Sequence, residues 1–289
     1  MKLRLFALLA AVLMLTGCGE HYEMRRDLSV YFENTDQVVE GIRRGLSEHW
    51  ESIVVEYSSH GDNMQDIEAI AEELMEFALA ETDSPTQGDY LRQQYGGYHL
   101  QYGRTASSGS YDYFLTIKPD YYTTPKQEQQ VTEAVREIAG NMTGSEYERV
   151  RAVYEYLKEN VDYDKAAAKS GSNSLKATAY AALIQHKAVC QGYAVAAYRL
   201  FRECGLPARV VTGTVTYEDG RQEYHAWDLV GIGGRYYELD ITWDDQIGSE
   251  DYFLRSAADM PGHRKDDKFL TESFLNTCPP ASESYSAGR

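Results

Sequence analysis

One helix-like segment that begins at Cys190 constrains the fold of this chain more than any other part of its sequence. Apolar and small residues recur after Cys190 at spacings of three and four, which predicts a helix of about four turns with one buried face. Three strand-like segments follow, at 208–217, 224–230 and 235–241, and turn signals separate them. This order predicts a mixed fold of helix and antiparallel strands in the second half of the chain.

The start of this helix gives Cys190 the surroundings of a reactive thiol. Free backbone N–H groups and the positive end of the helix dipole lie there, and both favour the thiolate. The dipole contributes at most about 2 kcal/mol, or roughly 1.5 pKa units. Thiols that pair with an imidazolium fall several units below the free value of about 8.5, so Cys190 needs a histidine partner to act as a nucleophile.

Two of the strands offer that partner, His225, together with a carboxylate, Asp240. If the turn at 231–234 places Val230 opposite Arg235, His225 and Asp240 face each other on one side of the sheet, with their Cβ atoms about 5 Å apart. A carboxylate in that place orients the imidazole and stabilises its charged form. A register slip by one residue would send the two side chains to opposite faces of the sheet.

These residues lie in motifs that resemble the transglutaminase-core superfamily, and the resemblance covers roughly residues 125–255. The motifs are Ala179-Tyr180-Ala181-Ala182-Leu183, Val189-Cys190-Gln191-Gly192-Tyr193, His225-Ala226-Trp227, Tyr237-Glu238-Leu239-Asp240-Ile241-Thr242-Trp243-Asp244 and, as in bacterial members, Asn160-Val161-Asp162-Tyr163-Asp164. The resemblance implies an α+β fold with a papain-like arrangement, in which the cysteine-bearing helix packs on an antiparallel sheet. It also implies a catalytic triad of Cys190 as nucleophile, His225 as general base and then acid, and Asp240 as the residue that orients His225.

The activity implied by the resemblance is acyl transfer from peptide or side-chain amides. Cys190 would attack the amide carbonyl, and either water or an amine would resolve the acyl-enzyme. Water would make the protein a cysteine protease or amidase and an amine would make it a crosslinking transglutaminase; the bacterial-type motifs slightly favour hydrolysis. The expected substrate is a peptide, a protein or a cell-wall peptide, and a non-catalytic lipoprotein binding module on the same fold is the alternative. The oxyanion hole would use the Cys190 N–H and a second donor, Tyr180 or Gln185.

The chain begins with a segment typical of an exported lipoprotein. Residues 1–17 carry two basic residues and then an apolar run that is too short to span a membrane. The run Leu-Thr-Gly-Cys at 15–18 resembles the bacterial lipobox, which implies cleavage before Cys18 and lipid attachment to its thiol. We therefore expect a lipid anchor at the extracytoplasmic face of the cell membrane, with 18–27 as a spacer. A hydrophobic N-terminal core helix is the alternative.

The formal net charge of −17 excludes one class of partner. Loss of residues 1–17, whose charged side chains are Lys2 and Arg4, would make the net charge −19. So acidic a chain lacks the excess of lysine and arginine that neutralises nucleic-acid phosphates, and we expect no nucleic-acid binding. Anionic lipid surfaces would also repel it, so the anchor and not the protein body would hold it at a membrane. Nothing in the sequence indicates an oligomeric state.

A proline-bracketed segment at 120–125 divides the remaining sequence into two predicted domains. Residues 28–120 are predicted to form a small α+β domain with a structural or substrate-positioning role, and residues 125–280 the catalytic domain. The elements expected in the first domain are a strand at 28–33, a helix at 36–48, a strand at 52–58, a helix at 66–81 and a hairpin of 95–103 and 111–118. The second domain is expected to open with helices at 126–139 and 145–160 and a polar loop at 165–174.

The sequence predicts no cofactor and no metal site. Five histidines lack zinc spacing and stand alone, namely His49, His60, His99, His186 and His263. The acidic residues Asp244, Asp245, Glu250 and Asp251 do not match an EF-hand loop, so we interpret them as a solvated turn. Cys204 is expected to pack inertly, and a Cys204–Cys278 disulfide is the less favoured interpretation. Trp227 and Trp243 flank the proposed triad, where they either shield it from water or fill the core.

Overall fold

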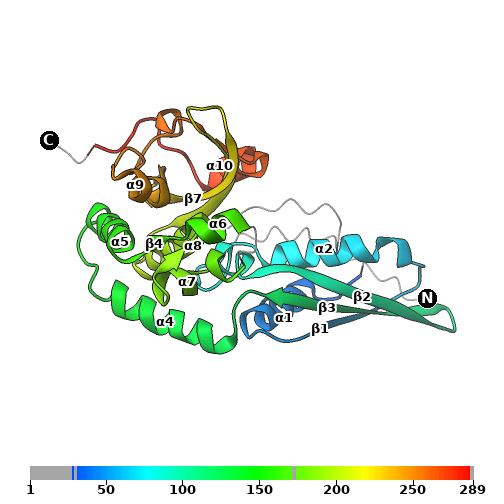
Figure 1. Ribbon diagram of the computed structural model, residues 1–289. Coiled ribbons are helices and arrows are strands. Elements are labelled where there is room, and N and C mark those ends of the chain that lie inside the picture. The colour runs from blue at the N-terminus through cyan, green and yellow to red at the C-terminus, as the bar shows by residue number, and fades with distance from the viewer. Residues whose placement is uncertain (1–27, 29–30, 171–173, 287–289) are drawn as a thin grey trace.

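The computed structural model describes residues 28, 31–170 and 174–286. The predicted leader at 1–17, the lipidation residue Cys18 and the predicted spacer lie outside the described residues. In the described part of the chain, no helix has both the length and the apolar character that a membrane crossing requires. Two antiparallel sheets organise the molecule, a three-stranded sheet at one end and a four-stranded sheet at the other (Figure 1). The chain is therefore a mixed α+β structure, as predicted.

The first region is the three-stranded sheet with two helices on one of its faces. Its elements are α1 (Thr35–Ser47), β1 (Ile53–Ser59), a 3-10 turn (Met64–Asp66), α2 (Ile67–Ala78), α3 (Asp89–Arg92), β2 (Tyr95–Ser107) and β3 (Ser110–Tyr121), with strand order β1-β3-β2. Val55 and Leu115 pair across β1 and β3 and join the core formed with α1 and α2. The neighbouring residues Val54 and Phe114 point the other way and are exposed. The alternation that defines a half-buried strand thus places the helices on one face.

Local signals account for the predicted elements that form. Asn34 caps α1 by accepting a hydrogen bond from the Gln37 N–H at 3.0 Å, which fixes the start of this helix at Thr35. The predicted hairpin also forms, but its strands are longer than expected. A two-residue turn at Ser108-Gly109 replaces the expected polar loop, and the φ of 88° at Gly109 is one that glycine adopts readily.

The predicted strand at 28–33 is wrong. The N–H groups of Tyr31 and Phe32 both bond to the Leu28 carbonyl oxygen at 3.0 Å, which turns the chain back on itself. Leu28 and Phe32 are buried in the first core. These two apolar side chains therefore contribute to the core of the first region without belonging to a strand.

The second region surrounds the four-stranded sheet of order β8-β7-β6-β9. Its elements are α4 (Pro125–Ala139), α5 (Glu146–Asn160), β4 (Asp162–Tyr163), α6 (Lys165–Ser170), a 3-10 turn (Leu175–Ala177), α7 (Ala179–Leu183), β5 (Lys187–Ala188), α8 (Cys190–Glu203), β6 (Ala208–Thr216), β7 (Gln222–Ile232), β8 (Arg235–Leu239), α9 (Ile241–Ile247), two further 3-10 turns (Ala257–Asp259 and Asp267–Leu270), β9 (His263–Lys265) and α10 (Glu272–Thr277). The short strands β4 and β5 pair in parallel. Part of the expected polar loop at 165–174 is helical, because α6 occupies it.

Helix α8 is the central element of this region. We expected one buried face, but every residue from Gly192 to Phe201 is buried. The reason is that α8 lies between two layers: β6 and β7 pack on one side and α4, α5 and α7 on the other (Figure 1). A helix enclosed in this way is held in position along its whole length, and so is the residue at its start.

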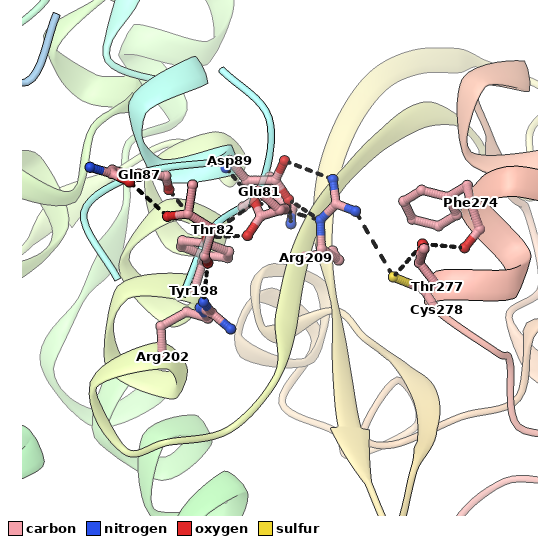
Figure 2. A network of polar contacts seen from close by, with 11 residues as sticks. Glu81, Thr82, Gln87, Asp89, Tyr198, Arg202, Arg209, Phe274, Thr277 and Cys278 are labelled. Atoms are coloured by element: carbon pink, nitrogen blue, oxygen red, sulfur yellow. Dashed lines mark hydrogen bonds and ion pairs between the residues drawn. The ribbon is translucent and has the colours of Figure 1, made fainter. Parts of the chain in front are cut away.

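The two regions share more than the short link between β3 and α4, which coincides with the predicted division at 120–125. Tyr90 of α3 belongs to the core of the second region. The Asp89 carboxylate accepts hydrogen bonds from Arg209 of β6 at 2.8 and 3.1 Å, and Tyr198 of α8 donates to Glu81 at 2.9 Å (Figure 2). The segment from Glu81 to Asp89 therefore supports both the sheet and the helix that begins at Cys190.

Candidate active site

Cys190 is the first residue of α8 and is partly exposed. The glycine two positions later explains how the helix start is seated. A Cβ at Gly192 would lie 2.7 Å from the Lys176 carbonyl oxygen and 2.8 Å from the Ala188 Cβ. Only glycine allows the first turn of α8 to approach these two segments so closely. The thiol is therefore held at a helix N-terminus, as the sequence predicted.

His225 and Asp240 meet beside this thiol. His225 lies on β7, is buried, and places its Nε2 2.7 Å from Asp240 Oδ2. Asp240 follows β8 and caps α9, where its Oδ1 accepts the Trp243 N–H at 3.0 Å. The Cys190 thiol and the His225 imidazole lie close enough for each to shift the pKa of the other. The structure thus brings the three predicted residues together, with the sulfur beside the imidazole and the imidazole hydrogen-bonded to the carboxylate.

The strand register that predicted this contact is nevertheless wrong by two residues. Val230 lies opposite Tyr237, because the hairpin turns at Gly233-Gly234. Strand β8 also ends one residue before Asp240, which is a helix cap and not a strand residue. An even slip keeps every side chain on its predicted face of the sheet, so His225 still meets the carboxylate.

The surroundings of these groups favour their charged forms. Burial raises the pKa of the Cys190 thiol, but the hydrogen bond and charge of His225, with the Ala226 N–H, outweigh it and the pKa is lowered. Burial lowers the pKa of His225, yet the adjacent Asp240 and Cys190 raise it to about 10. Burial raises the pKa of Asp240, but the hydrogen bonds and charges of His225 and His263 outweigh burial and hold this pKa well below its usual range. At neutral pH the arrangement therefore supports a thiolate–imidazolium pair beside an ionised carboxylate.

His263 is a member of this site that the sequence did not reveal. It begins β9, which pairs with β6 opposite Val215. Its Nε2 lies 2.9 Å from Asp240 Oδ2, and its Nδ1 lies 3.1 Å from the Pro261 carbonyl oxygen. We expected His263 to stand alone, and this is wrong. β9 has only three residues, which is too short for a periodic pattern to indicate a strand. Its pairing with β6 also joins segments that are far apart in the sequence.

Aromatic rings enclose the two imidazoles. Trp227 stacks on His225 with ring centroids 6.0 Å apart, and Trp243 is tilted against the same ring at 6.1 Å. The two tryptophans also contact His263, at 5.1 and 4.7 Å. Trp227 is buried in a core cluster and donates to Glu238 at 2.7 Å, whereas Trp243 is only partly buried. Both tryptophans thus border the imidazoles, and Trp227 fills the core as well.

The acidic residues after Asp240 have internal partners and do not form a solvated turn throughout. Asp244 is buried, accepts hydrogen bonds from the hydroxyls of Tyr154 and Ser249, and thereby fixes the end of α9. Asp245 accepts from Tyr193, and Glu250 forms a two-pronged ion pair with Arg151. These carboxylates serve structure in this fold.

The donor atoms of His225, Asp240 and His263 lie within 4.8 Å of one another, which is close enough to consider a shared metal ion. The two nitrogen–oxygen separations are 2.7 and 2.9 Å. Ligands of a tetrahedral zinc ion at its usual bond lengths would lie about 3.3 Å apart. The observed spacing is that of groups that share protons with each other.

The remaining predicted residues have simple surroundings. Gln185 accepts a hydrogen bond from Lys176 Nζ at 2.7 Å, and Tyr180 packs against the second core. The second donor of an oxyanion hole therefore stays a prediction. Cys204 and Cys278 do not form a disulfide with each other: Cys204 contacts Met142, and Cys278 lies beside Arg209 and Thr277.

Part of this chain is similar in sequence to proteins of a known family. Residues 132–241 match the model of the transglutaminase-like superfamily. Human kyphoscoliosis peptidase is 33% identical over 122 residues, which are 38% of this chain and 18% of that protein; the mouse protein is 33% identical over 107 residues, or 34% and 16%. The match thus spans less than a fifth of each curated relative. A crystal structure of a TGase aligns with 50% of this chain and with 45% of the TGase chain; the two are 21% identical in sequence, with a TM-score of 0.36.

Proposed function

We propose that this chain, which carries a transglutaminase-like domain at residues 132–241, is a cysteine-dependent acyl-transfer enzyme that acts on peptide or side-chain amides. The observation that carries the proposal is the placement of Cys190 beside His225, whose Nε2 lies 2.7 Å from Asp240 Oδ2. Each group comes from a different element, α8, β7 and the start of α9. Such an arrangement supplies a nucleophile, a group that moves protons and a group that orients it.

The reaction follows from the positions of these groups. The Cys190 thiolate attacks the amide carbonyl, and His225 gives its proton to the leaving nitrogen, which releases an amine and leaves a thioester on Cys190. Water or an amine then attacks the thioester while His225 takes up the proton of that nucleophile; the carbon–sulfur bond breaks, which restores the Cys190 thiolate and releases the acid or the new amide. Asp240 keeps the imidazole in the required orientation throughout. We expect the Cys190 backbone N–H at the start of α8 to be one of the donors to the oxyanion.

Two extensions belong to the same proposal. Hydrolysis, which would make the protein a protease or amidase, is slightly favoured over crosslinking, and the substrate is a peptide, a protein or a cell-wall peptide. We also propose that lipid on Cys18 holds the protein at the extracytoplasmic face of the membrane. Exchange of that residue, Cys18→Ser, should move the full chain from the membrane fraction to the soluble fraction of cells that process lipoproteins.

The proposal is tested by alkylation with iodoacetamide at about pH 6, followed by mass spectrometry of each cysteine peptide. Cys190 should react much faster than Cys204, whose pKa is raised by burial at the other end of α8. Cys204 is thus a control within the same molecule, and Cys204→Ser should not change the rate at Cys190. Equal, slow labelling of both thiols would favour a non-catalytic binding module.

A second experiment separates hydrolysis from crosslinking. The protein is incubated with a library of glutamine-bearing peptides, with and without a primary amine, and the products are weighed. Cleaved or deamidated peptides that form equally well in both samples indicate hydrolysis, while products that carry the added amine indicate transamidation. Cys190→Ser should abolish either outcome.

A further inference from the structure

Asp240 accepts hydrogen bonds from two imidazoles, although the proposed reaction uses only one. Its Oδ2 receives His225 Nε2 at 2.7 Å and His263 Nε2 at 2.9 Å, while its Oδ1 receives the Trp243 N–H at 3.0 Å. The donors come from β7, β9 and the start of α9. The carboxylate is therefore fixed from three directions, and its charge is divided between two rings.

We infer that His263 is a positioning residue of this site, which draws part of the Asp240 charge away from His225 so that His225 can release its proton to the leaving group. The inference rests on the proposed function, because that function is what requires His225 to give up a proton. His263 would act through Asp240 and would not contact the substrate itself.

The hydrogen bonds of His263 support this role. Its Nδ1 faces the Pro261 carbonyl oxygen at 3.1 Å and its Nε2 faces the Asp240 carboxylate. The Asp240 carboxylate can only accept, so the contact at Nε2 is a hydrogen bond that His263 donates. His263 therefore competes directly with His225 for the same carboxylate oxygen.

The surroundings make this competition effective. The side chains of Asp240 and His263 are 1% and 2% exposed, and the ring centroids of Trp227, Trp243 and Tyr252 lie 4.7 to 5.2 Å from that of His263. Charges that water does not screen interact strongly. The titratable groups next to the pair of imidazoles are Cys190, Asp240 and Tyr252. Asp228 and Tyr163 interact with Asp240, and the ion pair of Glu238 with Lys265 lies beside Trp227.

The consequence for the reaction is a weaker hold of His225 on its proton. If Asp240 served His225 alone, the imidazolium would be more stable and would be a poorer acid toward the leaving nitrogen. Removal of His263 should therefore raise the pH at which His225 loses its proton. A residue that merely held Asp240 in place would have the opposite effect, since a loosened carboxylate stabilises the imidazolium less.

The experiment measures the rate of Cys190 alkylation between about pH 4 and pH 11, where the upper step reports the loss of the His225 proton. His263→Leu should move the midpoint of that step upward by about half a pH unit or more, and His263→Gln, which keeps a neutral donor, should move it less. His60→Leu is the matched control, because His60 also faces a carbonyl oxygen, that of Gly109 at 3.0 Å, on the exposed surface of the first region. An unchanged or lower midpoint in the folded His263→Leu protein overturns the inference.

The two proposals fail in different ways. If Cys190 of the unaltered protein labels no faster than Cys204 at about pH 6, the proposed function fails whatever the variants do. If Cys190 labels fast but the midpoint does not move in the variants, only the role of His263 fails. Should His263→Leu not fold, His263→Gln and the imidazole nitrogen NMR signals of the unaltered protein decide: an unprotonated Nε2 of His263 at neutral pH overturns the inference.

Discussion

Two buried clusters of charge lie at different points along strands β6 and β7, one around Arg209 and one around His225, and they contain opposite proportions of acidic and basic groups. At the candidate site one carboxylate, Asp240, receives two imidazoles. In the cluster of Figure 2 two carboxylates, Glu81 and Asp89, share one guanidinium, that of Arg209. The first cluster has a surplus of groups that can carry a positive charge, and the second has a surplus of acid.

The difference separates a reactive cluster from a structural one. Arg209 holds Asp89 at 2.8 and 3.1 Å, and Asp89 also accepts the Val210 N–H at 2.8 Å; these contacts outweigh burial and lower the Asp89 pKa. Little of the Arg209 charge remains for Glu81, whose pKa burial and the Asp89 charge raise to about 8. A guanidinium does not release protons, whereas imidazoles do so near neutral pH. The site cluster therefore places proton-releasing groups beside the Cys190 nucleophile, whereas the cation of the other cluster is a guanidinium.

The largest expected effect is that of an aspartate-to-asparagine exchange at the candidate site, compared with the same exchange in the structural cluster. Asp240→Asn should lower turnover of a responsive amide peptide by about ten-thousandfold, because the amide leaves the imidazole in the wrong tautomer. Asp89→Asn is the matched control at a buried aspartate, and the folded protein should keep its rate of Cys190 alkylation at about pH 6. Turnover of the same peptide is measured for both variants. If the folded Asp89→Asn protein loses as much turnover as Asp240→Asn, the distinction between a reactive and a structural cluster is wrong.

The elements that carry the first cluster could be predicted from the sequence to different degrees. The periodicity after Cys190 and the Val- and Thr-rich strands predicted α8, β6 and β7, and the superfamily named from the motifs is confirmed by the match at 132–241. The register of the β7–β8 hairpin could not be predicted, because several residues at 231–234 suit a tight turn. The predicted contact between His225 and Asp240 forms despite this error, because a slip of two residues keeps each side chain on the same face of the sheet.

The rest depended on contacts between segments far apart in the sequence. His263 follows Pro261 and Gly262 and reaches the site only because β9 pairs with β6. Glu81 and Asp89 are separated from Arg209 by more than a hundred residues, and each alone resembles an ordinary surface charge. No local pattern distinguishes a buried acid from a solvated one, so this cluster could be found only in three dimensions.

The second prediction concerns Arg209, the cation of the structural cluster. Arg209→Met should lower the free energy of unfolding by about 3–5 kcal/mol, because it leaves the buried Asp89 carboxylate without its partner. Urea denaturation measures the change, and Cys190 of the remaining folded protein should still be alkylated fast at about pH 6. Arg221→Met is the control: Arg221 pairs with Glu223 in solvent, where loss of an ion pair costs about 1 kcal/mol or less. Equal costs for the two variants would contradict the prediction.

The smallest expected effect distinguishes the two acids of that cluster. Glu81 holds a proton in the folded chain up to its pKa of about 8, whereas a glutamate carboxyl in an unfolded chain loses its proton near the ordinary pKa of 4.5. Between these pH values the folded state binds one more proton than the unfolded state, so this group makes stability fall as pH rises through the window, with no further change above it. Glu81→Gln resembles the protonated acid and can still accept the Asp89 N–H and bond the Tyr198 hydroxyl, which accepts as well as donates.

Glu81→Gln should therefore match the original protein within about 0.5 kcal/mol near pH 5 and become the more stable of the two as the pH approaches 8. Urea midpoints measured at several pH values across this window test the prediction. The exposed Glu137, exchanged to Gln as a control, should leave the pH dependence of the original protein in place. If Glu81→Gln retains the whole decline in stability, Glu81 does not hold the extra proton, and the acid surplus of the structural cluster must be neutralised by another group.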